Sequence, residues 1–142
     1  MAQPFVPADP DMRRLLEETR TVAVVGLSDN PMRPSYGVAR YLYEVGYRVI
    51  PVNPKLTELW GLKAYPDLDS ARRDGIVVDM VDVFRDPAHV PQVVDETLRA
   101  GAKSLWLQEG VVHPEAAQRA SQAGLTVVMD RCVMKEHARL VA

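Results

Sequence analysis

Short apolar segments alternate with amphipathic ones along most of the chain. Near-continuous apolar runs predict buried strands over 21–26, 48–52, 75–84, 103–108 and 125–130. Apolar residues at helical spacing, bounded by proline or glycine, predict helices over 35–45, 87–100 and 114–123, with further helices from Asp9 and from about residue 131. Strands without polar alternation, each followed by a helix, are typical of a parallel sheet covered on both faces. The pattern therefore predicts an α/β fold, a Rossmann-like three-layer open parallel sheet with helices on both faces.

Two of the predicted helices show the face that should pack on the sheet. Their apolar residues recur three and four positions apart, as one side of a helix requires. The expected inner faces are Val38, Tyr41, Leu42 and Val45 in the first helix and Val90, Val93, Val94 and Leu98 in the second. The segment 56–75 is less regular, and we expect only a short strand near 63–65 and a short helix near 68–74.

Composition bounds the size and class of the protein. The chain has 142 residues, 47% of them hydrophobic, which predicts a single domain over 1–142 with one core. Its net charge is −2 with both signs dispersed, so nothing favours nucleic acid as a partner. No apolar run approaches the ~20 residues of a membrane span, and the N-terminus lacks a signal-peptide pattern. The single cysteine, Cys132, suits a reducing cytosol, so we expect a cytoplasmic protein. No particular protein partner is indicated.

Residues 21–55 form a predicted βαβ unit, the usual start of a nucleotide-binding fold. An apolar strand runs into Gly26, a loop leads to a helix, and a second strand follows. The helix amino terminus presents N–H groups and a positive dipole end, which suit a phosphate. The G-x-G-x-x-G pattern of dinucleotide sites would need glycine where this chain has Ser28 and Pro31. The unit therefore predicts phosphate binding but matches the NAD pattern poorly.

The end of the second strand narrows the ligand further. An NAD site places Asp or Glu there to hold the ribose hydroxyls, and this chain has Asn53, Pro54 and Lys55. A cation at this place favours a ligand with an additional phosphate on its ribose. Coenzyme A carries a 3′-phosphate and NADP a 2′-phosphate, so both remain candidates and NAD is disfavoured.

Ligands of an open parallel sheet lie outside the carboxyl ends of its strands. Here these ends are the loops 26–35, 52–55, 83–87 and 107–110. In the first loop Ser28, Arg33 and Ser35 offer two hydroxyls and a guanidinium that can bind phosphate oxygens. Ser35 could instead serve only as the N-cap of the helix, with Arg33 solvated.

Other reactive residue types give no sign of catalysis. Cys132 follows Arg131 near the start of the last helix, where a thiol can become reactive, but a lone cysteine is more often a packed residue. His89, His113 and His137 are scattered, so we expect them to be solvated or to cap helices, and we predict no metal site.

Two acidic and two aromatic residues have structural explanations. Asp79 and Asp82 have opposite parity in a strand, so they should not form an acid–base pair. Trp106 lies in the middle of a strand and should belong to the core. Trp60 lies in the irregular segment and could either cover the ligand or pack in the core.

Ordered motifs along the chain resemble a known family. They are Val25-Gly26-Leu27-Ser28 with Pro31, Arg33 and Ser35-Tyr36, then Gly46-Tyr47 and Val49 to Pro54, then Val81 to Arg85, Trp106 to Gly110, and Asp130-Arg131-Cys132. From about residue 15 to about residue 140 the chain resembles stand-alone CoA-binding-domain proteins, which are similar to the N-terminal domain of the alpha subunit of succinyl-CoA synthetase.

The resemblance implies which residues hold the ligand. The loop after the first strand would bind the CoA phosphates, the Asn-Pro-Lys segment would lie beside the adenosine phosphate, and the loops after the fourth and fifth strands would flank adenine and pantetheine. The residues implied are Gly26, Leu27, Ser28, Arg33, Ser35, Tyr36, Val52, Asn53, Pro54, Lys55, Val83, Phe84, Arg85, Gln108, Glu109 and Gly110.

We therefore expect a protein that binds coenzyme A or an acyl-CoA at the carboxyl ends of the strands, without catalysis of its own. Synthetases of the resembling kind phosphorylate a histidine in a second domain, for which we expect no room in this chain. One alternative is an NADP-dependent oxidoreductase, which the missing glycines disfavour. Another is a degenerate synthetase-like subunit that acts as an interaction module.

Overall fold

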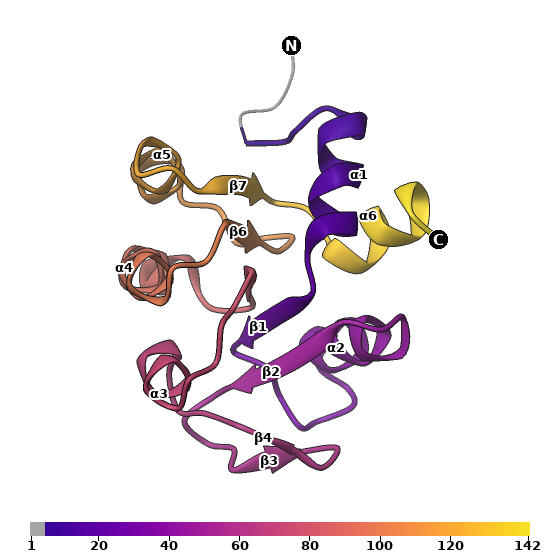
Figure 1. Ribbon diagram of the computed structural model, residues 1–142, viewed down its shortest axis with the longest axis vertical. Coiled ribbons are helices and arrows are strands. Elements are labelled where there is room, and N and C mark those ends of the chain that lie inside the picture. Colours follow the sequence, from indigo (N-terminus) through magenta and orange to yellow (C-terminus); the bar gives the residue numbers. More distant parts are fainter. Residues whose placement is uncertain (1–4) are drawn as a thin grey trace.

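A parallel sheet of five strands forms the centre of the computed structural model, which describes residues 5–142 (Figure 1). The strands are ordered β2-β1-β5-β6-β7. Their bounds are Thr21–Val25 for β1, Arg48–Val52 for β2, Met80–Val83 for β5, Ser104–Leu107 for β6 and Thr126–Met129 for β7. The predicted Rossmann-like sheet is confirmed. Residues 1–4 lie outside the described residues. The expectations that they belong to the single domain and that they lack a signal-peptide pattern therefore stay predictions.

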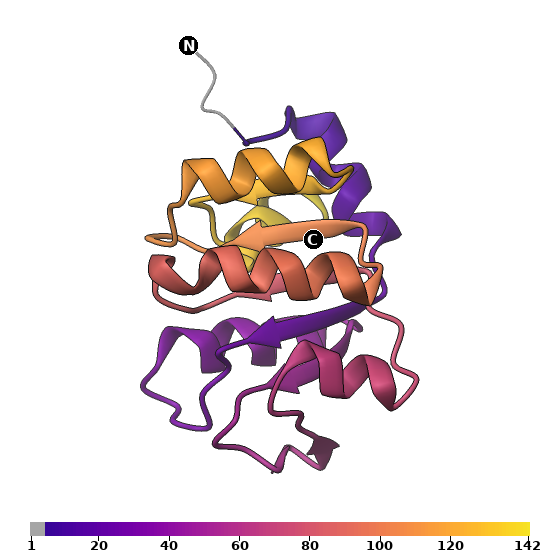
Figure 2. The same cartoon turned by 90° about the vertical axis from the view of Figure 1, so that its left-hand side faces the viewer.

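Helices cover both faces of the sheet, as the sequence predicts. One face carries α1 (Asp9–Glu18), α2 (Pro34–Glu44) and α6 (Val133–Leu140). The other carries α3 (Leu68–Arg73), α4 (Val90–Ala100) and α5 (Pro114–Gln122), with α4 between the other two in Figure 2. Because strand residues alternate in direction, Val22 and Val24 of β1 pack in the first layer, and Ala23 and Val25 pack in the second. Each side therefore has its own apolar core.

Strand β5 is shorter than the predicted strand over 75–84. It begins only at Met80. The residue before it, Asp79, hydrogen-bonds through its side chain to the backbone at the start of β1. The Asp79 carboxylate accepts the N–H groups of Arg20 and Thr21 at 3.1 and 2.9 Å, which fixes the entry to β1. Asp79 and Asp82 do not pair with each other, as expected.

The helix predicted over 87–100 has a different start and a different inner face. A 3-10 turn over Pro87–His89 precedes α4, and the Asp86 side chain accepts the N–H of Ala88 in that turn. Leu98, expected on the inner face, is exposed, and the buried position belongs to Thr97. The Thr97 hydroxyl donates to the carbonyl of Val93, so its one polar group is satisfied inside the helix. Val45, the last apolar residue expected on the inner face of α2, is also exposed.

The irregular segment supplies a rudimentary edge to the sheet. A short antiparallel hairpin, β3 (Glu58–Leu59) with β4 (Leu62–Lys63), replaces the strand predicted near 63–65. After it, Tyr65 forms an isolated parallel bridge to Val52 of β2. The bridge lies where the dinucleotide-binding strand order places one more strand, outside β2.

The strand order reverses between β1 and β5, which makes this the topological switch point of the sheet. From β1 the chain moves outward to β2, then crosses back to β5 and continues to β6 and β7. Helices on either side of this point leave the sheet on opposite faces, so a crevice opens above the carboxyl ends of β1 and β5. This is the place at which the fold offers a binding site.

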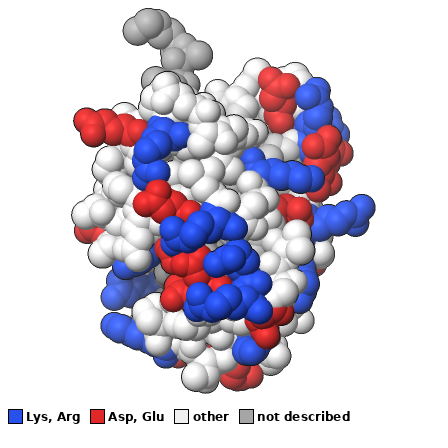
Figure 3. All heavy atoms as spheres, turned by 60° about the vertical axis from the view of Figure 1, so that its left-hand side comes forward, with Lys and Arg blue, Asp and Glu red and all other residues white. Residues whose placement is uncertain are grey.

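Charged side chains of both signs lie side by side on the face formed by α3, α4 and α5. Figure 3 shows Lys and Arg side chains interleaved with Asp and Glu side chains there. The ion pairs Arg99–Asp69 and Arg119–Asp95 account for part of this pattern and are partly exposed, so solvent screening limits what each contributes to stability. Among the described residues, no helix is long and apolar enough to cross a membrane.

One buried carboxyl group in the sheet has no partner. Asp82 of β5 lies between Val24 of β1 and Trp106 of β6, in the apolar layer below α1, α2 and α6. It is fully buried, and neither of its carboxylate oxygens meets a hydrogen-bond donor within residues 5–142. Burial disfavours the charged form and raises the pKa of Asp82 well above its ordinary value. The folded protein therefore keeps this carboxyl protonated at pH values where the unfolded chain ionises it.

Asp82→Asn should stabilise the protein at neutral pH. Because the folded pKa is raised, the penalty is absent below the ordinary aspartate pKa of 3.8. Above it the penalty grows by about 1.4 kcal/mol per pH unit until the folded carboxyl also ionises. Urea unfolding near pH 4 and near pH 7 should show that the advantage of Asp82→Asn is larger near pH 7. An advantage that does not change with pH would contradict this assignment, and Asp11→Asn on the exposed side of α1 serves as the control.

Candidate functional site

A cleft of about 1030 Å³ lies over the carboxyl ends of the strands. Its volume is at the upper end of the usual range for small-molecule sites. All four loops that the sequence singled out contribute to it. The predicted residues that line the cleft are Gly26, Ser28, Arg33, Ser35, Asn53, Lys55, Phe84, Arg85, Gln108, Glu109 and Gly110.

Gly26 brings the loops after β1 and β5 into direct contact. Its φ is +86°, and a Cβ atom placed on it would lie 2.5 Å from the carbonyl oxygen of Phe84. The Gly26 N–H donates to the Val52 carbonyl at 2.8 Å, which ties the same point to β2. Only glycine fits both the positive φ and the close approach. The floor of the cleft therefore depends on this residue.

The phosphate loop expected after β1 is held by its own side chains. Ser35 is buried, and its hydroxyl oxygen accepts the N–H of Ser28 at 3.0 Å. The Ser28 hydroxyl oxygen in turn accepts the N–H of Asn30 at 3.0 Å. The N-cap position of α2 belongs to Arg33 and not to Ser35, so the alternative of Ser35 as the cap is wrong. Ser35 instead holds the loop after β1 in place beside the amino terminus of α2.

Asn53 joins the second loop to the first. Its side-chain amide donates to the carbonyl of Leu27 at 2.9 Å, and its side-chain oxygen accepts the N–H of Lys55 at 2.8 Å. An aspartate could not donate the first of these bonds. Asn53 thus supports the loop geometry and places Lys55 at the edge of the cleft.

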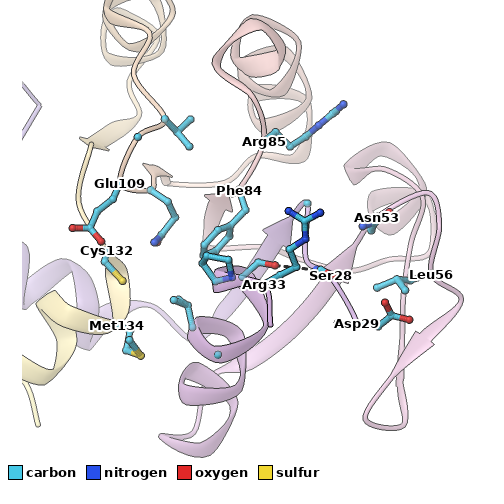
Figure 4. A pocket seen from close by; sticks show the side chains of 18 of the residues that line it. Ser28, Asp29, Arg33, Asn53, Leu56, Phe84, Arg85, Glu109, Cys132 and Met134 are labelled. Carbon is cyan, nitrogen blue, oxygen red and sulfur yellow. Dashed lines mark hydrogen bonds between the residues drawn. The ribbon is translucent and has the colours of Figure 1, made fainter. Parts of the chain in front are cut away.

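Positive charge dominates the cleft. Arg33, Lys55 and Arg85 form no ion pair in the described part of the chain. Lys135 is paired with Glu109 at 3.0 Å, and this contact raises the pKa of Lys135. In Figure 4 Arg33 lies between Ser28 and Phe84, whereas Arg85 extends outward from the next loop. Cations without partners beside a helix amino terminus are suited to bind an anionic ligand.

The opposite side of the cleft is formed around the start of α6. Figure 4 shows Cys132 and Met134 across the cleft from Asn53. Gln108 is buried, and its side-chain oxygen accepts the N–H of Val133 at 3.1 Å, which caps α6. The helix predicted from about residue 131 therefore begins at Val133. Gln108, like Asn53, supports the wall of the cleft.

Some predicted binding residues do not line the main cleft. Leu27 and Val83 are fully buried in the core, so any contact with a ligand would use their backbone. The Tyr36 hydroxyl accepts a hydrogen bond from the indole N–H of Trp60, and the two rings pack edge to face. Val52 and Pro54 line an adjoining cavity instead. Trp60 thus packs on Tyr36 at the side of the fold rather than over the cleft.

The sequence did not predict the contribution of the chain after β7. The lining residues that it missed are Asp29, Pro34, Gly37, Val38, Leu56, Val111, Cys132, Met134 and Lys135. One signal was available, because β7 is the last parallel strand and its carboxyl end meets the same edge as the others. The same rule that selects the other four loops therefore also selects the segment that follows β7.

The histidines lie outside the main cleft. The His113 side chain accepts the N–H of Ala116 and caps α5, and His89 is exposed, as predicted. The prediction for His137 is wrong, because it is buried, and its Nδ1 atom lies 2.8 Å from the Tyr41 hydroxyl. Burial lowers the pKa of His137. Within residues 5–142, no three His, Cys, Asp or Glu side chains gather in a way that could hold a metal ion.

The sheet and the crevice at its edge are those of a Rossmann-like α/β fold, and comparison with known proteins defines the family. Residues 20–138 match the family described as CoA binding domain. The chain belongs to this family. The predicted resemblance is therefore confirmed.

Relatives include both stand-alone and larger proteins. The uncharacterized protein YneT of Bacillus subtilis is 39% identical over 132 residues, which cover 93% of this chain and 96% of YneT. The alpha subunit of an ADP-forming acetate–CoA ligase II from Pyrococcus furiosus is 29% identical and matches over 87% of this chain but only 29% of that subunit.

Solved structures show the same two kinds of relative. A hypothetical protein from Pyrococcus horikoshii OT3 has a TM-score of 0.92 and 37% identity, with 100% of this chain and 98% of that one covered. A dinucleotide-forming acetyl-coenzyme A synthetase 1 from Candidatus Korarchaeum cryptofilum, in complex with phosphate and ADP, has a TM-score of 0.71 and 28% identity. The match covers 84% of this chain and 27% of that synthetase.

Gly26→Ala should destabilise the fold and distort the cleft. The added methyl group would meet the Phe84 carbonyl, and the positive φ would add strain of about 1–3 kcal/mol. Gly37→Ala is the matched control, because nothing lies within 4 Å of its added Cβ and the residue is helical. Thermal unfolding should show a lower Tm for Gly26→Ala and an unchanged or higher Tm for Gly37→Ala. Equal Tm values for the two variants would contradict the close contact.

Proposed function

We propose that the protein binds coenzyme A or an acyl-CoA in this cleft and does not catalyse a reaction by itself. The observation that carries the proposal is the set of cations Arg33, Lys55 and Arg85, which line one cleft and form no ion pair among the described residues, in a chain of the CoA-binding family. CoA carries a pyrophosphate and a separate ribose phosphate, so a ligand of this kind needs positive charge at more than one place.

The positions of the cations match the phosphates of such a ligand. Arg33 is the N-cap residue of α2, where a pyrophosphate would meet the positive end of the helix dipole. Lys55 follows β2, where dinucleotide-binding folds contact the ribose. Its backbone is fixed by Asn53, while its side chain is exposed and free to follow a phosphate. The two cations therefore suit two separate phosphate groups.

The far side of the cleft suits the other end of CoA. Val111, Met134 and Cys132 provide an apolar and polarisable wall there. A pantetheine arm that leaves the pyrophosphate toward this wall would place its thiol or thioester among these side chains. The wall supports binding of either free or acylated CoA.

The absence of catalysis in the proposal rests on the chemistry of the cleft. Its titratable lining residues in the described part include no histidine, and Glu109 is engaged by Lys135. Cys132 is only 5% exposed, which limits the access of a substrate to its thiol. The names of the acetate–CoA ligase and acetyl-CoA synthetase relatives support CoA as the ligand. Since this chain matches less than a third of each, their activity is not carried over.

The protein purified without denaturation should carry CoA or an acyl-CoA, which native mass spectrometry would identify by its added mass. In calorimetric titration Arg33→Ala should bind CoA about ten- to a hundred-fold more weakly, because a charge-assisted hydrogen bond contributes about 1.5–3 kcal/mol. Arg14→Ala on the exposed side of α1 is the control and should bind like the parent. Lack of CoA binding by the parent would refute the proposal. Turnover of acetate, ATP and CoA above background would refute its non-catalytic part.

Lys55 should distinguish CoA from dephospho-CoA. The parent should bind CoA more tightly by about 1 kcal/mol, or about fivefold, and Lys55→Ala should abolish the difference. Measuring two proteins with two ligands cancels general effects of the substitution on the loop. High salt should reduce the difference, because the contact is exposed. Equal affinities of the parent for both ligands would remove this role of Lys55, and tighter binding of NADP than CoA would favour the oxidoreductase alternative.

A further inference from the structure

A second cavity adjoins the cleft on the other face of the sheet. Its volume is about 510 Å³, and it shares Gly26, Asn53, Phe84 and Arg85 with the main cleft. The two cavities therefore meet above the ends of β1 and β5. A ligand bound in the cleft can extend across this point into the second cavity.

The walls of the second cavity suit a flat ring. Val52 and Pro54 come from the end of β2, and Pro66 and Leu68 come from the start of α3. The rest of the lining is largely polar and includes Asp67, Arg85, Asp86, His89, Gln92 and Glu96, so the cavity offers apolar contacts for an aromatic ring together with polar groups for its edge. The cavity lies on the Lys55 side of the crevice, where the proposed function places the adenosine phosphate.

Glu96 is the unexplained polar residue of this cavity. It lies on α4, is only 7% exposed and lines the cavity. No side chain within residues 5–142 hydrogen-bonds or pairs with its carboxylate, whose oxygens, unlike those of Asp82, are not fully enclosed. Such burial is unfavourable unless a donor is supplied. A ligand bound in the cavity could supply a hydrogen-bond donor to this carboxylate.

The surroundings of Glu96 do not satisfy it. Burial raises the pKa of Glu96, and so do two negative groups, Asp69 of α3 and Asp67, the N-cap residue of that helix. Two cations act on the Glu96 pKa in the opposite direction: Arg99 on α4, which is bonded to Asp69 at 2.9 Å, and Arg85, which lines this cavity as well as the main cleft. A ligand group with N–H donors would be favoured beside such a carboxylate.

Gln92 lies one helical turn before Glu96 and lines the same cavity. Residues four apart on a helix lie on the same side. A glutamine amide can both donate to and accept from the adjacent ring nitrogen and amino group of adenine. The pair thus offers an acceptor for an amino group and a further group for the ring edge beside it.

We propose that Glu96, assisted by Gln92, recognises the 6-amino edge of the adenine ring and makes the site selective for adenine over 6-oxo purines. The inference rests on the proposed function, because it takes the ligand to be a CoA. Adenine donates from its 6-amino group, and hypoxanthine has an acceptor oxygen at that position. The Glu96 carboxylate accepts the first and repels the second. Glu96 is therefore a specificity residue of the CoA site.

The test compares CoA with its analogue in which hypoxanthine replaces adenine, by calorimetric titration near pH 8. The parent protein should bind CoA about ten- to a hundred-fold more tightly than the analogue, because the 6-oxo oxygen of the analogue would face the Glu96 carboxylate where the 6-amino group of adenine donates. In Glu96→Gln the amide can turn to donate to the oxo group, so the preference should fall to within about threefold. Glu115→Gln, the same change at an exposed position of α5, should keep the parent's preference.

The outcomes separate this inference from the proposed function. Binding of CoA with equal affinity for the analogue, or an unchanged preference in folded Glu96→Gln, overturns the inference and leaves CoA binding in place. Failure of the parent to bind CoA overturns both. The comparison of the two ligands on the parent protein needs no variant, so a folding defect in Glu96→Gln, detected by circular dichroism, would not remove the test.

Discussion

The contact between Gly26 and the Phe84 carbonyl is the constraint on which the site depends. The two strands that lead into it are neighbours in the sheet but leave it toward helices on opposite faces. Any side chain at residue 26 would separate the loops that follow them. Because the backbones meet there, the cleft and the second cavity open on either side of one shared point. A long ligand can therefore occupy both cavities at once and stay in contact with the protein between them.

The polar side chains around this contact fall into two groups: some hold the loops in place, and others are available to a ligand. Ser35, Asn53 and Gln108 are tied to backbone groups and hold the loops in place. Arg33 and Lys55 are exposed and unpaired among the described residues, so they remain available to a ligand. A rigid frame that positions a few free charges lowers the entropy lost on binding. Under the proposed function, this division explains how a small domain with few ligating side chains can hold CoA.

The sequence predicted the fold well because its signals are local. Apolar runs and glycine or proline boundaries located every main strand and helix, and the loop positions followed from parallel pairing. What failed depends on tertiary contacts. Nothing local distinguishes Leu98, which is exposed, from Thr97, whose hydroxyl finds a partner within the helix and can be buried. His137 is likewise buried because Tyr41 reaches it from α2, a pairing of residues 96 positions apart.

The sequence predicted the position of the cleft more accurately than the structural roles of the residues that line it. Motif resemblance located Ser35, Asn53 and Gln108 in the cleft, but it could not tell a residue that holds a loop from one that contacts a ligand. Glu96 shows the converse, because a glutamate inside an amphipathic helix reads as a solvated residue until its burial and missing partner are seen. Unsatisfied buried groups are rare in native proteins, and each needs an explanation. Asp82 and Glu96 differ in this respect: both carboxylate oxygens of Asp82 are fully enclosed without a partner, whereas the Glu96 side chain borders a cavity that a ligand can enter.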